Sequence, residues 1–146
     1  MFVQVRIKLE IKGMNQVRHS ELKNIKSHEY FKKCGACRKI WLTENEFLND
    51  KKVKVLWLQV IPGFPDVNCI IFEHLECGST VSVLTPKLRH LLDRKLEIVK
   101  DLYGTEECNN LCNTRETMAA CDKNCVNAPD RELARLLVSY KSDSDE

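Results

Sequence analysis

The sequence has no long hydrophobic run. Its predominantly apolar stretches, such as VLWLQVI at residues 55–61, are far shorter than the roughly 20 residues that a membrane-spanning helix needs. The first twelve residues, MFVQVRIKLEIK, carry charges throughout and contain no continuous apolar segment, so they do not resemble a secretory signal. We therefore expect a cytoplasmic protein without a membrane segment.

Glycine and proline are also scarce, with five and four residues, which excludes collagen-like and linker-like chains. The 146 residues are 43% hydrophobic, which is normal for one globular domain or a small domain with an appendage. Charge is unevenly distributed: residues 1–54 hold 13 Lys and Arg against 6 Asp and Glu, whereas residues 55–146 hold 10 against 15. The basic first part could favour an anionic partner, but a mixed-charge solvated surface is the preferred interpretation.

Hydrophobic periodicity predicts a mixed α+β fold. Strict alternation of apolar residues predicts a strand over 2–11, β-branched and aromatic residues predict a strand over 53–61, and the next two strands are expected over 67–76 and 79–85. Capping signals and helical spacing predict helices over 43–50, over 86–101, after Thr105, after Asn113 and after Pro129. We expect a small antiparallel zinc-ribbon-like domain with an N-terminal strand (1–101), a cysteine-rich helical hairpin with a C-terminal helix (102–141), and a disordered tail (142–146).

Eight cysteines in a chain expected in a reducing compartment favour metal sites over a disulfide framework. Cys34 and Cys37 form C-x2-C, and His74 and Cys77 form H-x2-C followed by glycine. Each pair is typical of a zinc knuckle, a tight turn at a hairpin tip, and four such ligands make a closed structural Zn²⁺ site. A redox dithiol at Cys34 and Cys37, or unliganded thiols, are the alternatives. Cys69 is expected to be a small buried hydrophobe.

A second set, Cys108, Cys112, Cys121 and Cys125, forms two C-x3-C pairs eight residues apart. In a helix the Cβ atoms of residues i and i+4 lie about 6 Å apart, too far for a disulfide within either pair. On two facing helices the four thiolates could hold one Zn²⁺ ion or an iron–sulfur cluster. Nested disulfides across the hairpin (Cys108–Cys125 and Cys112–Cys121) and unliganded core thiols stay open as alternatives.

Two resemblances accompany these patterns. The twin C-x3-C hairpin resembles the small helical import chaperones of the mitochondrial intermembrane space, which implies the nested disulfides. The segments FLND, IIFEHLECGSTVSV, LYGTEECNNLC and CDKNC resemble small bacterial proteins in which a zinc-ribbon-like module precedes a cysteine-rich helical tail. This second resemblance covers roughly residues 30–140. It implies two cysteine clusters, and it carries over no catalytic residue.

The sequence shows no Ser–His–Asp set, P-loop or H-E-x-x-H motif, and both clusters offer four protein ligands, whereas catalytic zinc keeps an open position. We therefore expect a non-enzymatic, metal-binding interaction module whose partner is a protein or a nucleic acid. The alternative is a redox or metal-responsive protein that uses the second cluster as an iron–sulfur site or dithiol switch. The predicted binding surface lies around the first knuckle and consists of Lys32, Lys33, Arg38, Lys39 and Trp41.

Overall fold

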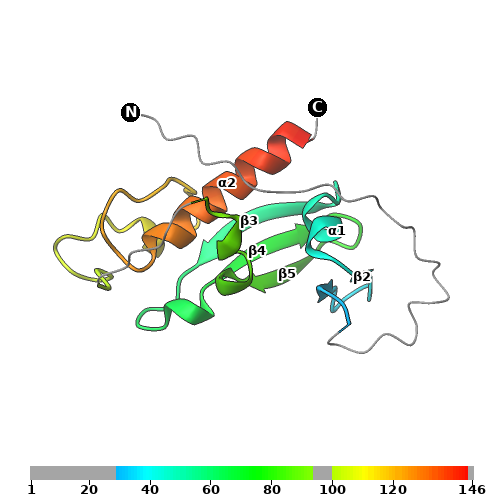
Figure 1. The fold of residues 1–146 in the computed structure, drawn as a ribbon, viewed down its shortest axis with the longest axis horizontal. Helices are drawn as coiled ribbons and strands as arrows, with labels where there is room; N and C mark the ends of the chain where they lie inside the picture. The colour runs from blue at the N-terminus through cyan, green and yellow to red at the C-terminus, as the bar shows by residue number, and fades with distance from the viewer. Residues whose placement is uncertain (1–28, 94–99, 145–146) are drawn as a thin grey trace.

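The computed structural model describes residues 29–93 and 100–144. Two antiparallel sheets and a C-terminal helix form the fold, which confirms the predicted α+β class (Figure 1). The elements are β1 (Lys32–Lys33), β2 (Ile40–Trp41), α1 (Glu44–Leu48), β3 (Val53–Gln59), η2 (Pro65–Val67), β4 (Cys69–His74), β5 (Ser79–Leu84), η3 (Thr85–Lys87), η4 (Arg89–Leu91), η5 (Leu111–Asn113) and α2 (Ala128–Ser144). The predicted strand over 2–11 lies outside the described residues.

The central sheet is a meander in the order β3-β4-β5, and its three strands match the predicted ones to within a few residues at each end. Strand β4 pairs along its full length with both neighbours, from Cys69 opposite Leu84 to His74 opposite Ser79. A bulge between Val55 and Trp57 shifts the register of β3. Antiparallel pairing places the β4–β5 turn, which carries the second predicted knuckle, at one end of the sheet.

The hydrophobic core lies between the central sheet, α1 and α2. Helix α2 crosses the sheet beside β3 (Figure 1) and contributes Leu133 and Leu137, which are both fully buried. The aromatic rings of Phe47 in α1 and Phe72 in β4 meet edge to face, with centroids 4.9 Å apart. One core therefore continues across the predicted boundary between residues 101 and 102.

The short helix α1 forms as the sequence predicts. The Thr43 hydroxyl accepts a hydrogen bond from the Glu46 backbone N–H (3.1 Å), and the Glu46 carboxylate accepts one from the Leu42 backbone N–H (2.8 Å). This reciprocal arrangement satisfies N–H groups that have no partner within the helix. At its C-terminal end, Lys141 of α2 donates to the carbonyl of Leu48 at 2.7 Å.

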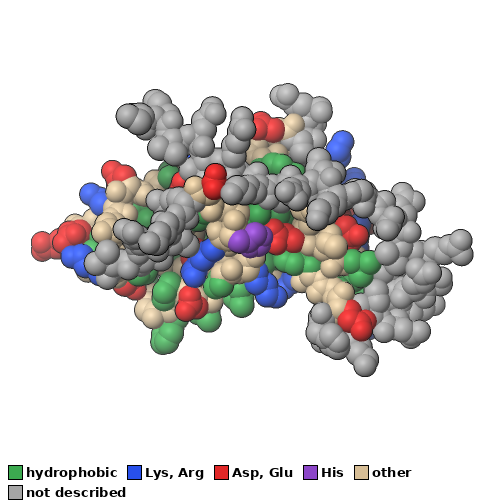
Figure 2. Space-filling model, in the orientation of Figure 1, with side chains coloured by type: hydrophobic (Ala, Val, Ile, Leu, Met, Phe, Trp, Pro, Cys, Tyr) green, Lys and Arg blue, Asp and Glu red, His purple; other side chains and the backbone are tan. Residues whose placement is uncertain are grey.

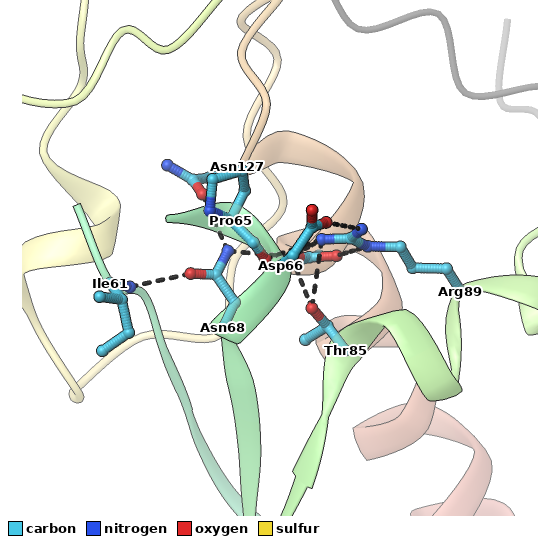
Figure 3. Close-up of polar contacts among 8 residues, drawn as sticks. Ile61, Pro65, Asp66, Asn68, Thr85, Arg89 and Asn127 are labelled. Carbon is cyan, nitrogen blue, oxygen red and sulfur yellow. Dashed lines mark hydrogen bonds and ion pairs between the residues drawn. The ribbon is translucent and has the colours of Figure 1, made fainter. Parts of the chain in front are cut away.

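A buried polar network joins the N-terminal end of α2 to the sheet (Figure 3). The Asp130 carboxylate, which is fully buried, accepts hydrogen bonds from the Asn68 amide (2.9 Å), the Thr85 hydroxyl (2.8 Å) and both Nε and Nη2 of Arg89 (2.9 and 3.0 Å). Asn127, just before the helix, accepts a further bond from Asn68 at 2.9 Å. The Asp130 carboxylate therefore has both a charge partner, Arg89, and hydrogen-bond donors, without which its burial would be energetically costly.

Three predicted helices are wrong where the structure describes them. Over 86–93 the chain forms two 3-10 turns, η3 and η4, and Leu92 is extended; residues 94–99 lie outside the described range. The side chain of Arg89 binds Asp130 and the Pro65 carbonyl, so tertiary contacts override the helical pattern here.

The cysteine-rich hairpin is not helical either, because residues 102–127 contain only the 3-10 turn η5. Thr114 and Thr117 each accept a hydrogen bond from the backbone N–H two residues later, at 3.1 Å in both cases. Such side-chain turns compete with helix formation. The final helix is confirmed, and it runs to Ser144, beyond the residue 142 at which the sequence predicts a disordered tail.

Candidate metal centre

The first knuckle closes the β1–β2 hairpin. The Cys34 backbone N–H donates to the Lys39 carbonyl at 2.8 Å, and the Arg38 N–H donates back to the Cys34 carbonyl at 3.0 Å. Arg38 adopts a left-handed conformation with φ of 66°, which completes the tight turn. These contacts hold Cys34 and Cys37 on the same side of the turn, as the C-x2-C pattern predicts.

The second knuckle closes the β4–β5 hairpin. The backbone N–H groups of Cys77 and Gly78 both donate to the His74 carbonyl, at 3.3 and 2.7 Å. Gly78 has a φ of 72°, a conformation that side chains disfavour and glycine adopts freely. The glycine after H-x2-C is therefore what the turn geometry requires.

The two knuckles meet, and their side chains form one cluster. Sγ of Cys34 lies 3.6 Å from Sγ of Cys77, and Nδ1 of His74 lies 3.4 Å from the sulfurs of both Cys37 and Cys77. All four ligand atoms lie within 4.8 Å of one another, the one such group of Cys, His, Asp and Glu among the described residues. The structure thus brings together the four residues of the first predicted site, in an arrangement that could hold a metal ion.

Hydrogen bonding in the cluster favours thiolate. Burial raises the pKa of the Cys34 thiol, but the Ser79 hydroxyl and the backbone N–H groups of Cys37 and Ala36 outweigh it and lower that pKa to about 5. The Ser79 hydroxyl, 3.5 Å from Sγ of Cys77, also lowers the pKa of Cys77. Because metals bind thiolates rather than thiols, this environment suits a metal ligand.

The pKa values of the other two ligands, Cys37 and His74, are shifted upward. The Lys39 backbone N–H stabilises the Cys37 thiolate, but burial and the neighbouring sulfurs outweigh it, and the pKa of Cys37 is raised. Burial lowers the pKa of His74, while hydrogen bonds to the sulfurs of Cys34 and Cys77 raise it by more. Metal ligands must be deprotonated, so a bound cation would compete with protons at these two groups.

Trp41 is buried against the His74 ring of the cluster and is not part of an exposed surface. The residue is 2% exposed, its ring meets the His74 ring edge to face at 5.0 Å, and its Nε1–H donates to Asp50 at 2.9 Å. The prediction that Trp41 contributes to a binding surface is therefore wrong. Although Trp41 belongs to a strand of only two residues, it is buried because Phe47 of α1 and His74 of β4 pack against its ring.

The basic residues of the predicted surface differ in their surroundings. Lys33, Arg38 and Lys39 are exposed, and Lys32 is half-buried. Lys39 forms an ion pair with Asp50 at 3.1 Å, so part of its charge is neutralised. Figure 2 shows basic and acidic side chains interspersed over the described part of the face that it draws.

The second set of cysteines also converges, but differently. Cys108, Cys112, Cys121 and Cys125 line one pocket with Leu102 and Tyr103. None of these thiols forms a disulfide, and no three of their sulfurs meet the spacing of the first cluster. Cys69, at the start of β4, is half-buried and belongs to neither group.

Sequence reasoning missed two contributors to these sites. Ser79 follows the second knuckle in the segment CGST, and its hydroxyl contacts the sulfur atoms of both Cys34 and Cys77. The only sign of this role in the sequence is that Ser79 lies two residues after Cys77. Arg131 of α2 reaches the cysteine-rich loop, and nothing in the sequence marks it apart from its place on the final helix.

Comparison with known protein families, with curated proteins and with solved structures finds no match for this chain. The resemblance to bacterial zinc-ribbon-like proteins therefore stays a prediction. Among the described residues, none of the helices is both long and apolar enough to cross a membrane.

Proposed function

We propose that the protein is a zinc-binding interaction module in which Cys34, Cys37, His74 and Cys77 hold one structural Zn²⁺ ion. The observation that carries this proposal is the spacing of the four ligand atoms. Zn–S bonds of about 2.3 Å and Zn–N bonds of about 2.0–2.1 Å place tetrahedral ligand atoms roughly 3.6–3.8 Å apart. The distance of 3.6 Å between the sulfurs of Cys34 and Cys77, and the two distances of 3.4 Å from Nδ1 of His74 to sulfur, are close to these values.

The orientation of His74 supports the same assignment. Its Nδ1 atom faces the sulfurs, and its Nε2 atom is buried without a hydrogen-bond partner, 3.6 Å from a carboxylate oxygen of Glu76. Histidines that bind zinc usually donate their second N–H to a carboxylate or carbonyl. The exposed Glu76 side chain needs only a small movement to accept that hydrogen bond.

The role of the ion would be structural. Four protein ligands fill a tetrahedron and leave no open position for a substrate. The hairpin that carries Cys34 and Cys37 has strands of only two residues each, too short to be stable alone. A zinc ion shared with the β4–β5 turn would fix this hairpin against the central sheet and hold its exposed surface in one shape.

Cobalt substitution tests the geometry of this site. The metal-free chain titrated with Co²⁺ should develop the intense visible bands of a tetrahedral ion with thiolate ligands, and Zn²⁺ should then bleach them. The Cys77→Ala variant should lose these bands, whereas Cys69→Ala should keep them. Weak bands of an octahedral ion in the unmodified protein would contradict the proposal.

We further propose that the partner of the fixed surface is a nucleic acid, recognised through its phosphates. Lys33 and Arg38 lie exposed on the first knuckle, and Lys52 of the turn before β3 lies exposed beside the second, where its carbonyl accepts the Leu75 N–H at 2.7 Å. These cations surround the two hairpin tips, and phosphate contacts of this kind are sequence-independent and weaken with salt.

Binding of a labelled single-stranded oligonucleotide, followed by fluorescence anisotropy against salt concentration, tests this partner. The double variant Lys33→Glu/Arg38→Glu should weaken binding at least about tenfold at low salt and flatten the logarithmic salt dependence by roughly one unit per lost contact. The matched control, Lys100→Glu/Arg135→Glu, makes the same charge change elsewhere. If the unmodified chain does not bind at low salt, the partner is a protein rather than a nucleic acid. Equal losses of affinity in the two variants would show that the hairpin tips are not the contact surface.

A further inference from the structure

The loop over residues 102–127 is unusually long for a segment of a compact domain without α-helix or strand. Its own apolar side chains are few, and most of its residues are exposed or half-buried. Its contacts with the rest of the fold include the Arg115 guanidinium, 4.4 Å from the Trp57 ring centroid, the hydrogen bonds from Arg131 to its carbonyls, and the packing of Met118 against the core. A group that cross-links the loop would restrict it further to one conformation.

The four cysteines of this loop line a common pocket, although the first and the last of them are 17 residues apart in the sequence. Their sulfurs are more widely spaced than those of the first cluster, because no three of them come within 4.8 Å of one another. A single tetrahedral ion requires the closer spacing. An iron–sulfur cluster places several iron and sulfide atoms between its ligands, so its four thiolates stand further apart.

Each of three sulfurs accepts a hydrogen bond from nitrogen. The backbone N–H groups of Leu102 and Asn110 donate to Cys125 and Cys108, both at 3.4 Å, and the side-chain amide of Asn109 donates to Cys121 at 3.5 Å. N–H groups directed at cysteine sulfur stabilise the thiolate, and they are one of the means by which proteins set the potential of iron–sulfur clusters.

Arg131 supplies a buried positive charge beside the fourth cysteine. The residue is 2% exposed and donates to the carbonyls of Ala119 (2.9 Å), Leu111 (3.1 Å) and Thr117 (3.1 Å). No carboxylate of the described residues forms an ion pair with it. The Arg131 guanidinium lies beside the Cys112 thiol. A buried cation requires a compensating negative charge.

We propose that Cys108, Cys112, Cys121 and Cys125 bind an iron–sulfur cluster. Four thiolates around such a cluster carry net negative charge, which Arg131 would compensate. The N–H donors would stabilise the sulfurs, and the cluster would hold the loop together in place of secondary structure. This site is separate from the zinc site, so the two proposals can fail independently.

Anaerobic purification of the full chain, followed by iron, acid-labile sulfide and visible absorption measurements, tests the proposal. We expect brown protein with iron and sulfide in equal amounts, and broad absorption that bleaches on reduction. Cys112→Ala should lose the iron and sulfide while retaining zinc, whereas Cys69→Ala should retain all three. The Arg131→Gln variant should hold the cluster less tightly, seen as faster loss of colour to an iron chelator.

A wild-type chain that stays colourless and iron-free, after both anaerobic purification and reconstitution with iron and sulfide, would overturn the proposal. Two equivalents of zinc in that protein would assign the second group to zinc instead. Disulfides between these four cysteines, detected by mass spectrometry of anaerobically alkylated protein, would overturn it equally. These measurements on the unmodified chain decide the question even if a loop variant fails to fold.

Discussion

Replacing Cys77 with alanine should release the zinc ion and unfold the β1–β2 hairpin. Sγ of Cys77 lies 3.6 Å from Sγ of Cys34 and 3.4 Å from Nδ1 of His74. Its loss would leave the zinc ion with three protein ligands. Structural zinc contributes about 10 kcal/mol or more of apparent binding free energy at neutral pH, which matches or exceeds the roughly 5–15 kcal/mol stability of a whole domain. We therefore expect a zinc-free protein with a severely lowered or absent thermal transition, measured by circular dichroism and elemental analysis.

The matched control for this experiment is Cys69→Ala. Cys69 lies in the same hairpin, at the opposite end of β4, and is half-buried outside both cysteine groups. Its replacement should change the free energy of unfolding by no more than about 1 kcal/mol. If both variants unfold alike, the effect of Cys77→Ala reflects damage to the sheet rather than loss of a metal ligand.

Replacing Asp130 with asparagine should destabilise the protein by about 3 kcal/mol or more. The change keeps the shape of the side chain but removes the charge that pairs with Arg89, and it turns an acceptor for four hydrogen bonds into a group with one acceptor oxygen. Breaking a buried ion pair typically costs about 3–5 kcal/mol, and the 18% exposed Arg89 side chain recovers part of its hydration. Urea unfolding followed by tryptophan fluorescence measures the difference.

Asp66 provides the control for this second prediction. Its carboxylate pairs with the same arginine at 3.1 Å, but its side chain is 86% exposed. Exposed ion pairs contribute at most about 1 kcal/mol, so Asp66→Asn should leave the urea midpoint nearly unchanged. Equal losses in the two variants would show that burial of Asp130 does not set the strength of the network, contrary to our account.

The sequence could predict the elements whose signals are local. β-branched and aromatic residues between turn signals located the central strands, and the Thr43–Glu46 pair located α1, because both patterns follow from the geometry of one element. The first cluster was predictable for a similar reason. Each knuckle is a local turn signature, and the fold then places Nδ1 of His74 3.4 Å from Sγ of Cys37, which brings the two knuckles together.

The sequence could not predict the features that depend on distant partners. Helical spacing over 86–101 and capping signals near Thr105 and Asn113 are real local preferences. These preferences are not realised because Arg89 forms an ion pair with Asp130, and because Arg131 donates hydrogen bonds to carbonyls of the loop. Trp41 was misjudged as a surface residue for the same reason: its burial comes from α1 and from His74, which lies 33 residues along the chain.

The most direct test of the central claim is the zinc content of the purified full chain, compared between the unmodified protein and the Cys77→Ala and Cys112→Ala variants. Our account predicts about one zinc ion per chain in the unmodified protein and in Cys112→Ala, and none in Cys77→Ala. Zinc retained by Cys77→Ala at the level of the unmodified protein would contradict the assignment of Cys34, Cys37, His74 and Cys77 as the zinc site.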